Sequence, residues 1–365
     1  MPRAAQFDGL RGLAISLVLW HHLVGAYLPS GHDSWLGWLK AGTDLAWCGV
    51  DLFFVLSGYF IGGILIDRWQ SPRFARVFYL RRSVRILPLY LVTLAAIFLA
   101  IWAGWPGAYN RFAPWVYGLF LTNFGLAAGS VWDWGPLTVL WSLAVEEQFY
   151  LVAPWVVGTI TPTRLGWLAA LLVIVAPFVR IGLCLLWPEW HLAAHVLMPA
   201  RMDTLACGVW IAWGVRSPAA RPVLDWLQSR SLAVFAVSTC ALGLLSALRF
   251  REGDVTQLWF GYSLIALTFA AVVALVTRGS PPGLIRLLSL QPLVALGRHS
   301  YSIYLWHMLI GVGVIRCLGG PTFVLNSFSG LCSVLLGFSV TWIAAAFSWK
   351  FLEAPLINWG HRHAY

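Results

Sequence analysis

Residues 45–66 read LAWCGVDLFFVLSGYFIGGILI, a run of twenty-two residues in which Asp51 is the one charged side chain. A helix needs about 20 apolar residues to cross the hydrocarbon core of a bilayer, so this run predicts a membrane-spanning helix. Nine further runs on either side meet the same criterion. We therefore expect an all-α, polytopic membrane helix bundle with about ten transmembrane helices, near residues 7–28, 45–66, 88–104, 138–160, 165–187, 195–215, 231–248, 257–277, 299–318 and 327–352.

The composition of the 365-residue chain agrees with a membrane protein. It is 60% hydrophobic, 15% aromatic and 10% charged, with a mean hydropathy of +0.77, whereas a soluble domain carries about 25% charged residues. This balance excludes a disordered, fibrous or disulfide-scaffold protein. No stretch of useful size is left for a soluble domain, so residues 1–365 are expected to form a single integral-membrane domain.

The net charge of +10 raises nucleic-acid binding as an alternative. The arginines instead crowd two loops, 68–85 and 216–230, as they do in the cytoplasmic loops of membrane proteins. An eleventh apolar stretch, 115–128, is short and contains Asn123. Treating that stretch as re-entrant rather than as a crossing places every arginine-rich loop on one side of the membrane, which predicts ten helices with both termini cytoplasmic and no nucleic-acid partner.

The remaining composition signals concern cysteines, the N-terminus and tryptophans. The six cysteines stand singly without CxxC spacing, so we expect apolar fillers and no metal site. The first apolar run contains Asp8 and Arg11, which a signal-peptide core does not tolerate, so the N-terminus is expected to be retained.

The connections near 29–44 and 105–137 are rich in Trp, Gly and Pro. Their aromatic residues belong either to the interfacial belt or to a surface that stacks on sugar rings.

Arg11 and His22 are the first candidates for chemistry, because ionisable groups inside spans are costly and mark functional sites by default. Eleven residues separate them, so on an ideal helix their directions differ by about 20°, with about 16 Å of rise between them. Arg11 is then expected near the cytoplasmic end and His22 at or beyond mid-membrane, facing one interior path. A neutral imidazole there accepts a proton from a hydroxyl. The alternative is a histidine that only hydrogen-bonds across a helix interface.

Two carboxylates, Glu146 and Glu147, fall in the middle of the fourth expected helix. Adjacent glutamates in hydrocarbon cannot both stay ionised and exposed, so at least one is expected to be neutral or paired with a basic residue. Glu146 lies one turn from Ser142 and is a candidate to orient His22 or a nearby arginine; a purely structural ion pair is the alternative. Other polar residues inside or at the ends of expected spans are Asp51, Ser57, Arg180, Arg201 with Asp203 as a local pair, Tyr301, Tyr304, His307 and Glu353.

Several short motifs resemble those of the acyltransferase-3 family of membrane O-acyltransferases, and together they cover nearly the whole chain. They occur in the family's order, which makes the resemblance strong although each string alone is short. One departure is the residue pair before the Trp-Ser-Leu segment, Val139 and Leu140, where many members carry a histidine. The motifs are FDGLRG at 7–12 followed by His22, GVDLFFVLSGY at 49–59, RSVRILP at 82–88, WSLAVEEQFY at 141–150, RMD at 201–203 and GRHSYSIYLWH at 297–307.

The resemblance implies transfer of an acyl group, usually acetyl, from cytoplasmic acyl-CoA to a hydroxyl of a carbohydrate acceptor. Acetyl-CoA is then a donor substrate, with no bound cofactor. Guanidinium groups suit phosphates, so Arg82, Arg85 and Arg11 are expected to bind the donor. His22 is expected to act as general base or as a transient acyl carrier, with Glu146 or Glu147 fixing its tautomer. The candidates for oxyanion or acceptor contacts are Ser142, Arg180, Tyr301, Asp51, Asp203 and His307.

The expected acceptor is an exopolysaccharide or another cell-envelope glycan, including a lipid-linked repeat unit, and the expected location is the bacterial cytoplasmic membrane. Acylation of a small molecule such as a macrolide sugar is the alternative within the family. Two readings lie outside it: a transporter of an anionic solute, which also needs intramembrane charges, and an inactive scaffold. The presence of Arg11, His22, Arg82, Arg85 and Glu146 argues against the scaffold.

Overall fold

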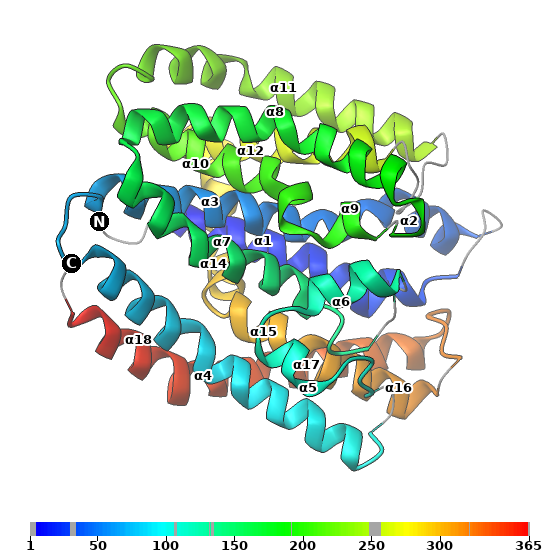
Figure 1. Cartoon of the computed structure of the whole chain (residues 1–365). Coiled ribbons are helices and arrows are strands. Elements are labelled where there is room, and N and C mark those ends of the chain that lie inside the picture. The colour runs from blue at the N-terminus through cyan, green and yellow to red at the C-terminus, as the bar shows by residue number, and fades with distance from the viewer. Residues whose placement is uncertain are drawn as a thin grey trace.

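The computed structural model describes residues 5–29, 34–105, 108–130, 132, 135–190, 192–247, 257–320 and 322–363. Within these residues every regular element is a helix and no strand occurs, which confirms the expected all-α bundle. Residue 248, the last of the expected span 231–248, and parts of the connections 29–44 and 105–137 lie outside them. The helices run roughly parallel and antiparallel along one direction, and the chain ends near Ala5 and His363 lie at the same end of the bundle (Figure 1).

Among the described residues, eight helices are long and apolar enough to cross a membrane. Their outer surface is apolar: Trp102, Phe178 and Leu186 are each at least two-thirds exposed, as in an integral membrane protein whose apolar surface faces lipid. They coincide with eight of the ten expected spans. Their bounds are Ala5–Tyr27 (α1 Ala5–Leu19 and its continuation), Trp35–Arg68 (α2 Trp35–Thr43, η3 Asp44–Cys48 and α3 Gly49–Arg68), Phe74–Trp102 (α4), Pro162–Leu186 (α8), Arg221–Leu245 (in α11, Arg221–Ala247), Trp259–Arg278 (α12 from Tyr262), Ser300–Gly319 (α15 Ser300–Trp306, η7 His307–Val312 and α16 Gly313–Gly319) and Phe328–His361 (α17 Phe328–Ser348, η8 Trp349–Glu353 and α18 Ala354–His361).

The other two expected spans form α7 (Leu140–Thr159) and α10 (Met202–Arg216). Both are buried along much of their length, and α10 is preceded by the short segments α9 (Ala193–Val196) and η5 (Met198–Arg201). The helix α10 packs closely on α3 through glycines. A Cβ atom on Gly58 would lie 1.9 Å from the Leu205 carbonyl oxygen, and one on Gly208 would lie 2.1 Å from the Val55 carbonyl oxygen. Side chains at these positions would push the two backbones apart.

Substitution of Gly58 by alanine is therefore expected to destabilise the bundle by about 1–3 kcal/mol through overpacking. Gly182, inside α8, has no atom within 4 Å of its Cβ position. Gly182→Ala is expected to be neutral or slightly stabilising, because alanine is favoured over glycine in a helix by roughly 0.5–1 kcal/mol. Thermal melting of the two variants in detergent would measure the difference. Equal melting temperatures for both would contradict the packing seen between α3 and α10.

The stretch 115–128 forms no spanning helix, as predicted. It is divided into α5 (Pro114–Gly118) and α6 (Thr122–Gly129), with Phe120 between them at φ 55°. Eight helical residues extend about 12 Å, which is less than half of the hydrocarbon thickness. Asn123 in α6 is not exposed to lipid, because its amide exchanges two hydrogen bonds of 2.9–3.0 Å with the Gln148 amide of α7.

The arginine-rich segment 68–85 was expected to be one loop, but only residues 69–73 connect the helices, so this expectation is wrong for residues 74–85. Helix α4 begins at Phe74 and carries Arg81, Arg82 and Arg85 in its first turns. Similarly, α11 begins at Arg221, ten residues before the expected span. Helices continue past the apolar region because long arginine side chains can extend toward polar surroundings while their stems stay on apolar surface. The consequence is that these arginines sit on rigid elements. The remaining short helices in this end of the bundle are α13 (Pro282–Leu288) and α14 (Gln291–Arg298).

Candidate functional site

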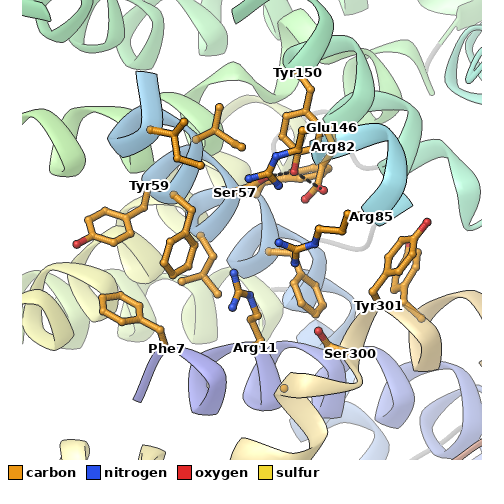
Figure 2. Close-up of a pocket in the computed structure, with 18 of the residues that line it drawn as sticks. Phe7, Arg11, Ser57, Tyr59, Arg82, Arg85, Glu146, Tyr150, Ser300 and Tyr301 are labelled. Carbon is orange, nitrogen blue, oxygen red and sulfur yellow. Dashed lines mark hydrogen bonds between the residues drawn. The ribbon is translucent and has the colours of Figure 1, made fainter. Parts of the chain in front are cut away.

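A cavity of about 690 Å³ opens at the end of the bundle where the two chain ends lie. Its walls are formed mainly by α1, α3, α4 and α7, and by residues between Gly297 and His361 (Figure 2). Its wall has an excess of positive charge, since three carboxylates face six arginines. The arginines are Arg11, Arg81, Arg82, Arg85, Arg216 and Arg298, and the carboxylates are Asp67, Glu146 and Glu353.

The arginines at the rim are engaged by the protein itself. Arg216 pairs with Asp67 at 2.9 Å, and Arg81 donates to the His363 carbonyl oxygen at 2.5 Å. Deeper in the cavity, the guanidinium groups of Arg11, Arg82 and Arg85 are directed toward the same space (Figure 2). Arg11 pairs there with Asp8 at 3.3 Å, whereas the Arg85 guanidinium has no hydrogen bond or ion pair among the described residues. This places Arg11, Arg82 and Arg85 together, as predicted, in a space suited to an anion.

Glu146 lies in this cavity and not beside His22. Its Oε2 accepts a hydrogen bond of 2.9 Å from the Tyr150 hydroxyl, which also bonds to Ser57, and the Arg82 guanidinium lies 5.3 Å from the centre of the Tyr150 ring (Figure 2). Of the two expected roles, orientation of His22 is therefore wrong, whereas a place near an arginine agrees with the shared cavity wall of Glu146 and Arg82. Glu147 is absent from the walls of both cavities, and its Oε1 has no hydrogen-bond partner among the described residues. Neighbouring positions on a helix face about 100° apart, which separates the two carboxylates.

A second, much smaller cavity of about 30 Å³ lies beyond the first. Its wall includes His22, Asp51 and Arg201, together with several aromatic side chains. Val50 and Tyr304 line both cavities, so these two side chains form the boundary between them. The Tyr304 hydroxyl is fixed there by bonds to the Ser142 hydroxyl at 2.5 Å and the Val139 carbonyl oxygen at 2.8 Å.

His22 is held by a backbone carbonyl and by a second histidine. Its Nδ1 lies 3.0 Å from the Val18 carbonyl oxygen and 3.3 Å from Nε2 of His307. The Nδ1 of His307 lies 2.6 Å from the Tyr304 carbonyl oxygen. A carbonyl oxygen only accepts, so each Nδ1 carries the hydrogen and donates it. The lone pair of His22 is consequently on Nε2, the tautomer that a general base requires.

Both histidines of this pair lie in π-helical turns, His22 in Trp20–Val24 and His307 in His307–Val312. Such turns widen the helix to i→i+5 bonding and occur frequently at functional sites. The 100° rotation per residue that aligned Arg11 with His22 does not hold across the first of them. Arg11 and His22 were expected to face one interior path, but they line different cavities.

Four buried charged residues form two ion pairs that differ from the expected one. Arg180 pairs with Asp203 at 2.8 Å, and Arg201 pairs with Asp51 rather than with Asp203. A local Arg201–Asp203 pair does not form because Asp203 accepts from the neighbouring Thr204 backbone N–H and from Arg180 on α8. Arg180 and Asp203 are absent from the cavity walls, so the expectation of Arg180 as an oxyanion contact is not supported by its position.

The other two candidate oxyanion donors already use their hydrogens. The Tyr301 hydroxyl donates to the Ile86 carbonyl oxygen at 2.8 Å. The hydroxyls of Ser142 and Tyr304 lie within hydrogen-bond distance of each other, and each also lies within that distance of the Val139 carbonyl oxygen. Their two hydrogens are used in these bonds. Neither hydroxyl has a hydrogen left for a substrate in this arrangement.

Sequence reasoning missed His195, a histidine in the short helix α9. Its Nδ1 bonds the Tyr262 hydroxyl, and its ring centre lies 4.8 Å from that of Trp141, 5.1 Å from Trp132 and 6.0 Å from Trp47. It lies in the wall of the small cavity. The one available signal was a histidine at the edge of an apolar stretch, which is common. Within the described residues, no group of three His, Cys, Asp or Glu side chains has the arrangement of a metal site.

Comparison with known proteins identifies the family of the chain. The acyltransferase-3 model, described as an acyltransferase domain, matches residues 5–347. The chain is 28% identical over 394 aligned residues to the peptidoglycan O-acetyltransferase OatA of Listeria monocytogenes, covering 96% of this chain and 55% of the relative. It is 24% identical to the O-acetyltransferase OatA of Staphylococcus aureus, covering 97% and 57%, and 27% identical to the putative peptidoglycan O-acetyltransferase YrhL of Bacillus subtilis, covering 97% and 55%.

The chain thus spans a little over half the length of these relatives. No solved structure matches it. The family match extends from the first helix, with Arg11 and His22, into α17, so it includes the residues that line both cavities except those after residue 347. This chain belongs to the acyltransferase-3 family.

Proposed function

We propose that the protein transfers an acetyl group from cytoplasmic acetyl-CoA to a hydroxyl of a cell-envelope glycan, within the bacterial cytoplasmic membrane. The observation that carries this proposal is the contact between two cavities: an arginine-rich space of about 690 Å³ meets the His22 cavity at Tyr304 and Val50. The names of the relatives support acetyl as the group and an envelope glycan as the acceptor. An exopolysaccharide repeat unit fits the same chemistry.

The large cavity suits the donor in charge and size. Arg82 and Arg85 project from the first turns of α4, and Arg11 from α1, into one space. Guanidinium groups bind phosphate oxygens with paired N–H donors, and cavities of roughly 300–1,000 Å³ hold ligands of drug size. The arginines at this end of the bundle support, by the positive-inside rule, a cytoplasmic location in this proposal. The nucleotide of acyl-CoA is then bound at the arginines, and its pantetheine arm extends toward Tyr304.

His22 is proposed as the general base. The acceptor hydroxyl transfers its proton to Nε2 of His22 while its oxygen attacks the thioester carbonyl carbon. The tetrahedral intermediate collapses with cleavage of the C–S bond, and the imidazolium returns the proton to the leaving thiolate, so that CoA and the ester are released. His307 holds the Nδ1–H tautomer of His22 during these steps. A transient acetyl-His22 is the alternative route to the same ester.

Transfer of labelled acetyl from acetyl-CoA by membranes that contain the protein tests this function. We expect label in the glycan fraction, separated from free acetate, and competition by unlabelled CoA. Membranes lacking the protein give the background. Label that stays in acetyl-CoA, with no binding of CoA by the purified protein, would overturn the proposed function and favour a transporter, which flux of an anionic solute would then reveal.

A further inference from the structure

The small cavity contains a buried ion pair whose hydrogen-bonding capacity is only partly used. Arg201 is 1% exposed and Asp51 is fully buried. They share one hydrogen bond, from Nη2 of Arg201 to Oδ1 of Asp51. The Oδ2 of Asp51 and the Nε and Nη1 of Arg201 have no hydrogen-bond partner among the described residues. Both residues line the cavity that also contains His22.

Unused charged atoms at this depth are costly, because a buried donor or acceptor without a partner loses its hydration and regains nothing. The second pair in the same region is better satisfied. Arg180 donates to the Ala200 carbonyl oxygen, to Asp203 and to Ser263, and leaves only Nε without a partner. Arg180 lies outside both cavities. Three of the four side-chain atoms without a hydrogen-bond partner in these two ion pairs therefore belong to Arg201 and Asp51, which line the His22 cavity.

The Arg201 guanidinium is held in place on its apolar side. Its carbon lies 4.1 Å from the centre of the Tyr262 ring and 5.9 Å from that of Phe54. Cation–π contacts of this kind are strongest where water is excluded. A group that is fixed before the ligand arrives loses little conformational freedom on binding, which favours specific recognition.

The charge of the pair decides which ligand it suits. Asp51 contributes an acceptor and Arg201 contributes donors, and together they are neutral, so an anion would meet the carboxylate as well as the guanidinium. A neutral hydroxyl both donates and accepts, and it satisfies both. The volume of about 30 Å³ corresponds to roughly two hydroxyl-sized groups. Trp132 of the same wall is partly exposed, and its apolar ring suits the C–H face of a sugar ring, whereas Trp141 is buried.

We propose that Arg201 and Asp51 form the acceptor-binding site, and that they hold a hydroxyl group of a sugar unit beside the one that reacts at His22. This inference rests on the proposed function. Asp51 Oδ2 accepts the hydrogen of that neighbouring hydroxyl, and Arg201 donates to its oxygen. The sugar ring stays outside the cavity, on the side of Trp132, because about 30 Å³ holds only hydroxyl-sized groups. The pair thereby sets which hydroxyl of the acceptor reaches Nε2 of His22.

The test compares Arg201→Lys, Asp51→Asn and Arg180→Lys in membranes, with labelled acetyl-CoA and with soluble fragments of envelope glycan as the probe. The readout is the ratio of glycan acetylation to acetyl-CoA hydrolysis, in which water replaces the sugar. We expect this ratio to fall at least tenfold in Arg201→Lys and Asp51→Asn, since a hydrogen bond to a charged group is lost. Arg180→Lys is the matched control, equally buried and ion-paired, and its ratio is expected to stay at the wild-type value.

A ratio is independent of how much protein folds, so poor folding of one variant does not imitate the effect. Unchanged ratios in Arg201→Lys and Asp51→Asn would overturn the proposal and leave the pair a structural one. A second readout is the rise in melting temperature of the purified protein on addition of the same fragments. A rise that is present in wild type and Arg180→Lys but lost in Arg201→Lys supports the site even if no acetyl transfer occurs. No rise in wild type, together with no transfer to glycan, would overturn it.

Discussion

Replacement of His22 by alanine is expected to lower acetyl transfer by about 10²–10⁴-fold, the range for loss of a positioned general base. The physical reason is the tautomer: the Val18 carbonyl oxygen and His307 hold the hydrogen on Nδ1, which leaves Nε2 to accept a proton. If an acetyl-His22 intermediate forms instead, the loss is at least as large. The measurement is the initial rate of glycan labelling from acetyl-CoA, normalised to the amount of folded protein.

The control for this prediction is His299→Ala. His299 contacts the Ala295 carbonyl oxygen and is absent from the walls of both cavities, so its loss is expected to change the rate by less than a few-fold. Binding of CoA is expected to persist in His22→Ala, because the arginines lie in the other cavity. A His22→Ala enzyme that retains wild-type transfer would exclude this histidine as the base.

Joint replacement of Arg82 and Arg85 by alanine is expected to raise KM for acetyl-CoA by about a hundredfold or more. Each guanidinium lost removes a charge-assisted bond of about 1.5–3 kcal/mol, and 1.4 kcal/mol corresponds to a factor of ten. The effect on kcat is expected to be smaller, since the reacting groups lie beyond Tyr304. The measurement is the dependence of the transfer rate on acetyl-CoA concentration in the variant and the wild type.

Arg85→Lys separates charge from geometry, because lysine keeps the charge but not the planar fork; its KM is expected to lie between those of wild type and the alanine variant. Arg164→Ala provides the control, since Arg164 begins α8, is exposed and is absent from the cavity walls. The KM of wild type is also expected to rise with salt, as phosphate binding at an accessible arginine cluster is screened. An unchanged KM in the double variant would place the donor elsewhere.

The helices were predictable because each span satisfies a local rule. Eight of the ten expected runs meet the length and hydropathy criterion in the structure, and the other two form α7 and α10. Boundaries were less predictable: α4 begins at Phe74 rather than near residue 88, since arginines at a helix end reach polar surroundings without ending the helix. The division of 115–128 into two short helices follows from its length and from Asn123.

The sequence predicted which polar residues lie inside the bundle, but it did not predict which residues they contact. Arg11, Arg82 and Arg85 meet as expected, because intramembrane charges point to the interior. Glu146 bonds Tyr150 instead of His22, and Arg201 bonds Asp51, which lies 150 positions away in the chain. His307 was among the candidates, yet its place beside His22 had no signal in a linear pattern. His195 had no usable signal.

The amino-acid sequence by itself determined that this protein is a membrane bundle of helices with arginines, histidines and carboxylates in its interior, because hydropathy and the cost of burying charge act on each segment separately. Only the tertiary structure decided which of those groups lie together, namely the arginines around the large cavity, His22 with His307, and Arg201 with Asp51. These contacts depend on how each helix is rotated and shifted against its neighbours. Close glycine contacts between α3 and α10 and the π-helical turns at both histidines set that rotation, and neither follows from the composition of one segment.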